Sequence, residues 1–179
     1  MNSIDILTKA FDKNKSVNYV IKQDNRREKR IRSLIEYSFN NTLRFGKIFS
    51  IDNKAYAYVS FPHQYKTDIF ATIKLIFSSL GFRNIKRVLR FKSQLKKYYP
   101  KEFVYLDFIG IDPLFQGQGI GSTLVQEIIA FAKQQNLPLY LETSTVENIA
   151  FYKKNGFEQY GELQLEYPLF LFRINEEKI

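Results

Sequence analysis

A nearly continuous apolar run, FVYLDFIGI at residues 103–111, is the feature that most constrains the fold of this chain. Pro100 precedes the run, and Asp112-Pro113 follows it, so residues that interrupt regular structure mark both of its ends. A segment that is apolar on both faces suits a strand in the middle of a sheet, covered on both sides. We therefore expect an α/β protein whose central strand lies within this run.

The segments around this strand alternate between helical and extended patterns, and 179 residues fit one domain. The pattern predicts helices at residues 5–11, 26–39, 68–80, 84–98, 119–135 and 146–155. It predicts further strands at residues 17–22, 137–141, 157–167 and 169–174, and a hairpin formed by 45–51 and 55–61.

Composition excludes several classes of protein. The chain has no Cys, which excludes a disulfide scaffold, a catalytic cysteine and a thiolate metal site. Its single histidine, His63, argues against a His-rich metal site, so we expect no metal. No signal peptide is visible, and the best membrane candidate, residues 69–80, is too short and carries Lys74. We expect a soluble, cytoplasmic protein without a membrane partner.

Charge is unevenly distributed along the chain. Residues 1–101 hold 22 basic and seven acidic side chains, whereas residues 102–179 hold five basic and 11 acidic ones. Residues 83–101 alone carry eight basic side chains and no acid, which indicates either a surface for a polyanion such as nucleic acid or a solvated helix face. No aromatic RNA-binding motif accompanies the stretch, so specific nucleic-acid recognition is not indicated. The basic part favours an anionic substrate and the acidic part a cationic amine, and the sequence does not decide between them.

A glycine-rich turn joins the apolar strand to the next predicted helix. Gly117, Gly119 and Gly121 alternate in the segment QGQGIGS, residues 116–122. Glycines let the backbone approach a ligand, and free N–H groups and the helix dipole make a helix N-terminus a site for phosphate. Ser122 adds a hydroxyl. The segment is neither a P-loop nor a G-x-G-x-x-G dinucleotide motif.

Two motifs resemble those of the GNAT N-acetyltransferase superfamily. Gln116-x-x-Gly119-x-Gly121, within residues 103–122, resembles motif A, Q/R-x-x-G-x-G/A. Residues 139–157, with LET, an Asn and then FYKKNGF, resemble motif B and are nearest to the branch that contains puromycin acetyltransferase. The resemblance covers residues 102–175 well, and it implies that residues 1–179 form a single GNAT-type acetyltransferase domain.

The resemblance implies a fold and a co-substrate. The GNAT acyltransferase fold has a mixed, mostly antiparallel sheet of six or seven strands, with splayed central strands and flanking helices. Its loop amides hold the pyrophosphate of acetyl-CoA, and its splayed strands pair with the pantetheine arm. The cofactor-binding residues implied here are Ile109, Gly110, Ile111, Gln116, Gly117, Gln118, Gly119, Ile120, Gly121, Ser122, Asn148 and Tyr152.

Three residues are the catalytic candidates. Tyr152 matches the family position of the general acid that protonates the leaving thiolate, and Glu142 resembles the base of the ribosomal-protein alanine N-acetyltransferases. Asp107 is an alternative base, because a carboxylate within an apolar strand is costly unless it is paired or functional. A period of two places Asp107 on one strand face with Tyr105, Ile109 and Ile111. Glu102 is a weaker option, and a water relay would need no side-chain base.

The leading hypothesis is an acetyl-CoA-dependent N-acetyltransferase that moves acetyl to a primary amine of a small molecule, protein or peptide by direct attack in a ternary complex. Two alternatives stay open. One is a GNAT-like module that binds CoA or nucleic acid, and the other is an acetyltransferase acting on an RNA-linked amine such as aminoacyl-tRNA. We expect a monomer or a homodimer.

Overall fold

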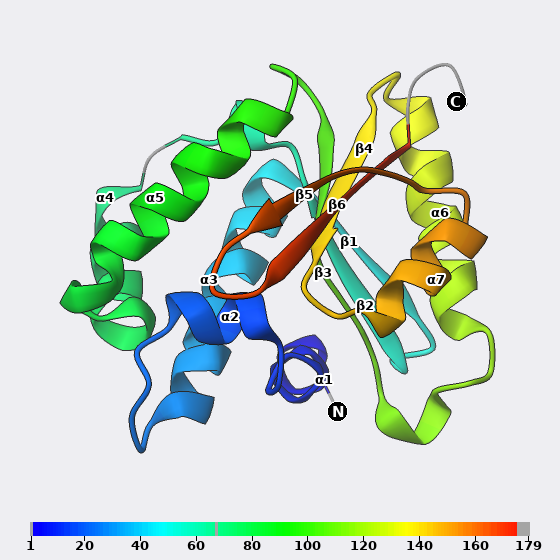
Figure 1. The fold of residues 1–179 in the computed structure, drawn as a ribbon. Coiled ribbons are helices and arrows are strands. Elements are labelled where there is room, and N and C mark those ends of the chain that lie inside the picture. The colour runs from blue at the N-terminus through cyan, green and yellow to red at the C-terminus, as the bar shows by residue number, and fades with distance from the viewer. Residues whose placement is uncertain (1, 67, 175–179) are drawn as a thin grey trace.

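The computed structural model describes residues 2–66 and 68–174. Six strands form one sheet in the order β1-β2-β3-β4-β6-β5, and helices cover both of its faces (Figure 1). The strands are β1 (Gly46–Ile51), β2 (Ala55–Ser60), β3 (Val104–Ile111), β4 (Leu139–Thr143), β5 (Glu158–Gln164) and β6 (Pro168–Ile174).

Seven α-helices and several shorter turns connect these strands in the described residues. The α-helices are α1 (Ser3–Ala10), α2 (Lys15–Val20), α3 (Arg27–Phe45), α4 (Ile69–Leu75), α5 (Ile85–Leu95), α6 (Ile120–Gln134) and α7 (Glu147–Lys154). A π-helical turn, Ile76–Leu80, continues α4, and 3-10 turns occupy Pro62–Gln64, Phe82–Asn84, Lys96–Tyr98 and Pro113–Phe115. None of the helices in this part of the chain is both long and apolar enough to cross a membrane.

The sheet is antiparallel except between β3 and β4. These two strands run parallel and pair at only two positions, Val104 with Leu139 and Tyr105 with Tyr140. Beyond Tyr105, β3 pairs only with β2, and beyond Tyr140, β4 pairs only with β6. The two central strands therefore splay apart, which confirms the predicted fold class.

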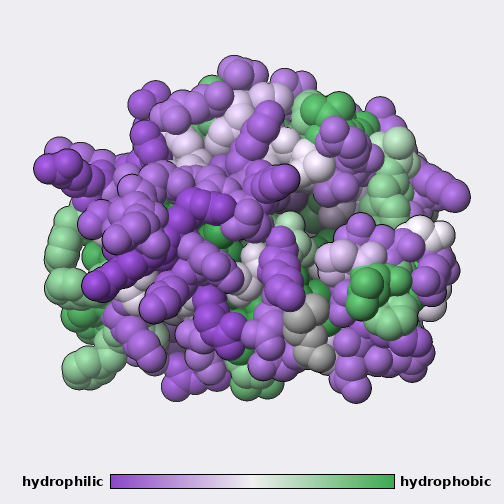
Figure 2. Space-filling view, turned by 90° about the horizontal axis from the view of Figure 1, so that it is seen from below, coloured by the Kyte–Doolittle hydropathy of each residue, from purple (hydrophilic) through white to green (hydrophobic). Residues whose placement is uncertain are grey.

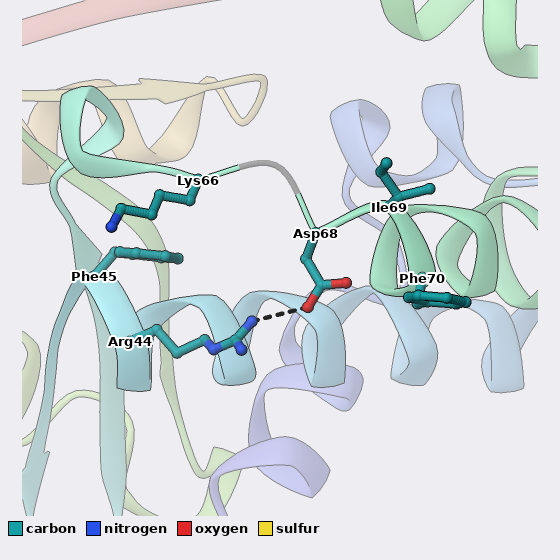
Figure 3. A pocket seen from close by; sticks show the side chains of 6 residues that line it. All are labelled: Arg44, Phe45, Lys66, Asp68, Ile69 and Phe70. Atoms are coloured by element: carbon teal, nitrogen blue, oxygen red, sulfur yellow. Dashed lines mark hydrogen bonds and ion pairs between the residues drawn. The ribbon is translucent and has the colours of Figure 1, made fainter.

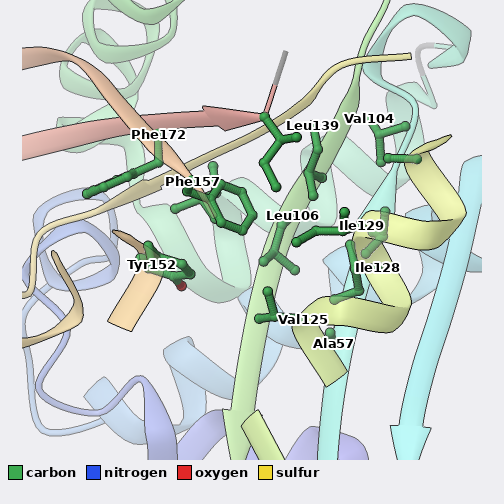
Figure 4. Close-up of a cluster of buried hydrophobic side chains, with 14 of the residues drawn as sticks. Ala57, Val104, Leu106, Val125, Ile128, Ile129, Leu139, Tyr152, Phe157 and Phe172 are labelled. Atoms are coloured by element: carbon green, nitrogen blue, oxygen red, sulfur yellow. The ribbon is translucent and has the colours of Figure 1, made fainter. Parts of the chain in front are cut away.

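The sheet separates one large buried cluster from two smaller ones. The larger one packs α6 and α7 against one face and includes Leu106, Ile128 and Phe172 (Figure 4). The other face carries α1 and α3, whose Leu7, Ile31 and Ile35 are fully buried. Apolar residues spaced three and four apart on each helix supply these faces, as amphipathic periodicity predicts.

A β-bulge in β3 changes which residues share a face. Tyr58 of β2 pairs with Phe108, but its neighbour Val59 pairs with Leu106, so Asp107 is the extra residue. The alternation of side chains therefore reverses at Asp107. Consequently Ile109 and Ile111 pack toward α6, on the face opposite Tyr105 and Asp107, and the sequence-based assignment of all four residues to one face is wrong.

Another sequence prediction is also wrong. Residues 17–22 do not form a strand, because most of the segment belongs to α2. The side chain of Asn14 accepts a hydrogen bond from the Val17 amide and so caps this short helix, and Val17 is buried among α1 and α3 residues. The predicted hairpin, by contrast, is confirmed, and Asp52 and Asn53 adopt the left-handed conformation at its turn.

Candidate active site

The glycine loop, residues 116–122, presents its backbone to solvent at the start of α6. Gly117 and Gly119 have φ values of 77° and 81°, and a Cβ atom added to either would meet nothing within 4 Å. Within the described part of the chain, the amides of residues 117–121 have no hydrogen-bond acceptor. A row of free amides at a helix N-terminus fits a phosphate group.

Gly121 has a different role from the two exposed glycines. A Cβ atom at this position would lie 2.8 Å from Cδ1 of Ile111, so the glycine permits close packing between α6 and β3. The loop lies at the lower edge of the molecule in Figure 1, and the surface seen from below is mainly hydrophilic, with hydrophobic side chains in separate patches (Figure 2). Gln116 and Gln118, on either side of Gly117, are exposed, so polar side chains accompany the free amides of the loop.

A large cavity lies on the other face of the sheet. Its volume is about 720 Å³, and its walls come from α3, α5, the segments that follow β2 and α5, and the splayed strands β3 and β4. Seven aromatic side chains line it, namely Tyr37, Tyr65, Phe91, Tyr99, Phe103, Tyr105 and Phe108. A cavity of this size and apolar character is typical of a small-molecule site.

Glu142 of β4 reaches this cavity and is held by two tyrosines. The hydroxyl of Tyr99 donates to its Oε1 atom, and the hydroxyl of Tyr105 donates to its Oε2 atom. Burial raises the pKa of the Glu142 carboxyl, while the two hydrogen bonds act in the opposite direction. Both carboxylate oxygens are thus occupied, and the side chain is fixed in orientation.

Asp107 lines the same cavity from the bulge in β3. Burial raises the pKa of its carboxyl to about 7, the neighbouring charge of Glu142 adds to the rise, and the Ser60 hydroxyl and Lys92 oppose it. Its Oδ2 atom is buried and has no hydrogen-bond partner among the described residues. An acceptor in this position can take a proton or hydrogen bond from a ligand at neutral pH.

Tyr152 of α7 lies on the opposite face of the sheet from these two carboxylates. Its ring packs against Phe157 and Phe172 in the larger cluster (Figure 4). Burial alone raises the pKa of the Tyr152 hydroxyl, so this group keeps its proton at neutral pH. The structure therefore brings Asp107 and Glu142 together and places Tyr152 across the sheet from them.

The other candidate residues lie around these groups. Gln116 is exposed, and its Nε2 atom donates to the Ile111 carbonyl at 3.4 Å. Asn148 donates from Nδ2 to Oγ1 of Thr143 at 3.4 Å, next to the end of β4. Ser122 and Ile120 are half-buried in the first turn of α6, and Gln118 is exposed. Glu102 is exposed and does not line the large cavity, whereas His63 does.

Sequence reasoning missed the two tyrosines that hold Glu142. Tyr105 had a usable signal, because it stands two residues before Asp107 on the same strand, and a period of two places both side chains on one face. Tyr99 had none, because it lies in an irregular segment 43 residues before Glu142. Only the tertiary structure brings these side chains into contact.

A second hollow, of about 550 Å³, lies between the end of α3 and the start of α4 (Figure 3). An ion pair between Arg44 and Asp68, 2.9 Å long, spans it. None of the candidate catalytic residues lines this hollow. The large cavity is therefore the better location for chemistry.

Comparison with known proteins gives the family. The model of the Acetyltransferase (GNAT) family matches residues 22–157, which is most of the chain. The chain belongs to the GNAT family of acetyltransferases. The family predicted from the two motifs is thereby confirmed.

Curated relatives match only part of this chain. N-alpha-acetyltransferase RimI of Mycobacterium tuberculosis (strain ATCC 25618 / H37Rv) is 38% identical over 53 residues, which are 30% of this chain and 34% of that protein. An uncharacterized protein of Mycobacterium leprae (strain TN), ML0378, is 35% identical over 60 residues, which are 34% of this chain and 17% of that protein. The chain thus matches about a third or less of the length of these relatives.

Solved structures share the fold over nearly the whole chain. A histone acetyltransferase HPA2 and related acetyltransferase from Corynebacterium glutamicum ATCC 13032 has a TM-score of 0.64 and 18% identity, covering 95% of this chain and 87% of that one. The C-terminal condensation domain of Ebony has a TM-score of 0.71 and 10% identity, covering 96% and 91%. These likenesses support the fold alone. Among the described residues, no cluster of three or more His, Asp or Glu side chains could hold a metal ion.

Proposed function

We propose that this chain is a single acyltransferase domain that transfers acetyl from acetyl-CoA to a primary amine bound in the large cavity. One observation carries the proposal. Asp107 and Glu142 line the cavity just beyond the last β3–β4 pair, Tyr105 with Tyr140, while the glycine loop follows β3 at the N-terminus of α6. A co-substrate lying between the splayed strands would reach both sites.

The residues of the chain divide the binding of acetyl-CoA between them. The free amides of residues 117–121 would hold the pyrophosphate, with Gln116 and Ser122 beside them. The unpaired edges of β3 at residues 109–111 and of β4 would hydrogen-bond the pantetheine amides, with Asn148 at the end of β4. Bound there, acetyl-CoA would supply the thioester carbonyl that the amine attacks.

Asp107 is the general base in this proposal. Its carboxyl, with a pKa of about 7, accepts the proton that the amine loses as its nitrogen forms a bond to the thioester carbonyl carbon. Glu142, fixed by Tyr99 and Tyr105, attracts the amine as its cation, which releases one proton to solvent before the neutral nitrogen attacks. Tyr152 keeps its proton and donates it to the CoA sulfur as the C–S bond breaks.

The first test is a calorimetric titration with acetyl-CoA, with ATP as a polyanion control at two salt concentrations. We expect binding that is selective for acetyl-CoA and only mildly salt-dependent. Binding that is equal for both ligands and lost in salt would overturn the proposal. The two alternatives gain no support of their own, because Lys92, Lys96 and Lys101 of the basic stretch line the large cavity and Arg87 pairs with Glu166.

Substitution of Asp107 tests the assignment of the base. We expect Asp107→Asn to lower kcat by roughly 10²-fold or more and to leave acetyl-CoA affinity unchanged. Thiol release in the presence of an amine measures kcat, and calorimetry measures the affinity. Glu102→Gln is the control, since Glu102 is exposed and outside the cavity. An Asp107→Asn enzyme with full kcat would assign the proton transfer to Glu142 or to water.

A further inference from the structure

The large cavity contains charges of both signs, on different elements. Its acidic side chains, Asp107 and Glu142, come from the sheet and are buried or half-buried. Its basic side chains, Lys92, Lys96 and Lys101, come from α5 and the segment after it, and all three are exposed. The cavity is therefore acidic at the sheet and basic at the solvent side.

Among the residues that the structure describes, the lysines of the cavity lack a salt-bridge partner such as Arg87 has. In the described residues, none of the three forms a salt bridge, whereas Arg87, earlier on α5, lies 3.1 Å from Glu166. Lys92 acts on Asp107 only through its charge and forms no salt bridge with it. Unpaired cations beside a binding site favour a ligand with an anionic group.

Aromatic side chains line the cavity that these charged groups share. Tyr37 comes from α3, Phe91 from α5 and Phe108 from β3, and Tyr65 follows the turn after β2. Rings on several sides favour a flat apolar body, which they can contact by stacking or edge-to-face packing. The volume of about 720 Å³ accommodates a compact molecule.

Resting on the proposed function, we infer that the acceptor is a small aromatic amine that carries an anionic group at the end opposite its amine. The amine lies between Asp107 and Glu142, the ring lies among the aromatic side chains, and the anion meets Lys92 and Lys96. The anionic group is a carboxylate or a phosphate, which the lysines bind by the same chemistry. The basic stretch and the acidic second half of the sequence thus serve two ends of one ligand.

Four probe amines separate these features. They are 2-phenylethylamine, which has no anion, 4-(2-aminoethyl)benzoate, tyramine O-phosphate, and 6-aminohexanoate, which has no ring. We expect one or both of the two anionic aromatic amines to have a kcat/KM at least tenfold above that of 2-phenylethylamine and of 6-aminohexanoate. The better of the two identifies the anion. Equal values for all four amines, or a preference for 2-phenylethylamine, would overturn the inference.

A variant pair tests the lysines directly. In Lys92→Gln/Lys96→Gln, we expect the ratio of kcat/KM for the anionic aromatic amine to that for 2-phenylethylamine to fall about tenfold. Lys97→Gln is the matched control, since Lys97 is exposed beside Lys96 but does not line the cavity. An unchanged ratio in the double variant, or an equal fall in the control, would overturn the inference.

Direct binding keeps this test separate from the proposed function. Calorimetric titration of the four amines into the protein without acetyl-CoA measures acceptor recognition alone. Tighter binding of an anionic aromatic amine supports the inferred ligand chemistry of the cavity even if acetyl-CoA fails to bind, and that failure would count against the proposed function. If acetyl-CoA binds but the anionic aromatic amines neither bind nor react, the proposed co-substrate stands and the inference fails. A peptide amine that reacts in their place would have the same consequence.

Discussion

The bulge at Asp107 gives a single carboxylate two properties that a regular strand would not combine. The bulge makes Asp107 the extra residue of β3, so its side chain lines the cavity while Leu106 and Ile109 pack into the cluster on the other face. Burial then raises the pKa of the carboxyl to about 7. The geometry of one residue thus produces a group that titrates near neutral pH.

The raised pKa of Asp107 predicts a pH dependence of stability. The unfolded carboxyl ionises near 3.8, whereas the folded one keeps its proton up to about pH 7, so the free energy of unfolding falls between these values as pH rises. The shift corresponds to a loss of up to about 4 kcal/mol. Asp107→Asn has no carboxyl to ionise, so it should gain stability relative to wild type between pH 4 and pH 8.

Urea unfolding at pH 4, 6 and 8 measures this difference. Glu142 also has a raised pKa, so the variant should retain part of the slope. Glu102→Gln serves as the control and should follow the wild-type curve, since its carboxylate is exposed. Parallel curves for wild type and Asp107→Asn would contradict the raised pKa.

Tyr152 and Tyr58 form a matched pair of buried tyrosines. The Tyr58 hydroxyl is 2.8 Å from Oγ of Ser3, whereas no described residue hydrogen-bonds the hydroxyl of Tyr152. Tyr152→Phe should change the free energy of unfolding by less than about 1 kcal/mol but should lower kcat. Tyr58→Phe should cost about 1–3 kcal/mol, since it leaves Ser3 unpaired, and should keep kcat. Thermal unfolding measures the stability of both variants, and thiol release measures their kcat. An unchanged kcat in Tyr152→Phe would refute the acid role of Tyr152.

At the scale of elements, the separation of β3 from β4 shapes the site. Only two residue pairs join the strands, and beyond them each strand pairs with its outer neighbour. The short parallel contact fixes where the strands begin to diverge, and α6 starts from a loop that follows the diverging end of β3. The glycine loop therefore follows the same strand that contributes Asp107 to the large cavity.

Two glycines test the role of the loop. Gly117 and Gly156 have φ values of 77° and 95°, and a Cβ atom at either would meet nothing within 4 Å. Alanine at each position should therefore cost a similar free energy of unfolding, about 1–2 kcal/mol, from backbone strain alone. Only Gly117→Ala should weaken acetyl-CoA binding, because Gly156 follows α7, outside the glycine loop. Calorimetry measures the affinity, and equal affinities in the two variants would argue against a pyrophosphate at residues 117–121.

At the scale of the whole molecule, the core extends beyond the matched family region. The family model matches residues 22–157, yet α1, which packs on the sheet, and β6, which pairs with β4 and β5 within it, lie outside this range. Leu7 of α1 is fully buried, and a Cβ atom on Gly110 of β3 would lie 2.8 Å from its Cδ2 atom. The N-terminal helix thus supports the strand that carries Asp107.

Leu7→Ala measures this support. Removing a fully buried leucine should cost about 2–5 kcal/mol. Leu43→Ala, at a leucine of α3 that is 62% exposed, should change stability by no more than about 0.5 kcal/mol. Urea unfolding compares the two variants. A small effect at Leu7 would mean that α1 docks loosely on the sheet.

The sequence by itself determined the central strand, the glycine loop, the following helix and the family. Each of these depends on neighbouring residues, since an apolar run, closely spaced glycines and helical periodicity act over short stretches of chain. The same local logic failed for α2. There the side chain of Asn14 caps a helix in a segment whose pattern predicted a strand.

Only the tertiary structure decided how the site is assembled. The bulge at Asp107 arises from register with β2, so the faces of β3 could not be assigned from a period of two. The contacts of Tyr99 and Tyr105 with Glu142 join residues 43 and 37 positions apart. The pKa of a carboxyl depends on its burial and on charges brought near by folding, which no stretch of sequence contains. Motifs could therefore name the candidate residues, but packing between distant segments decided their environment.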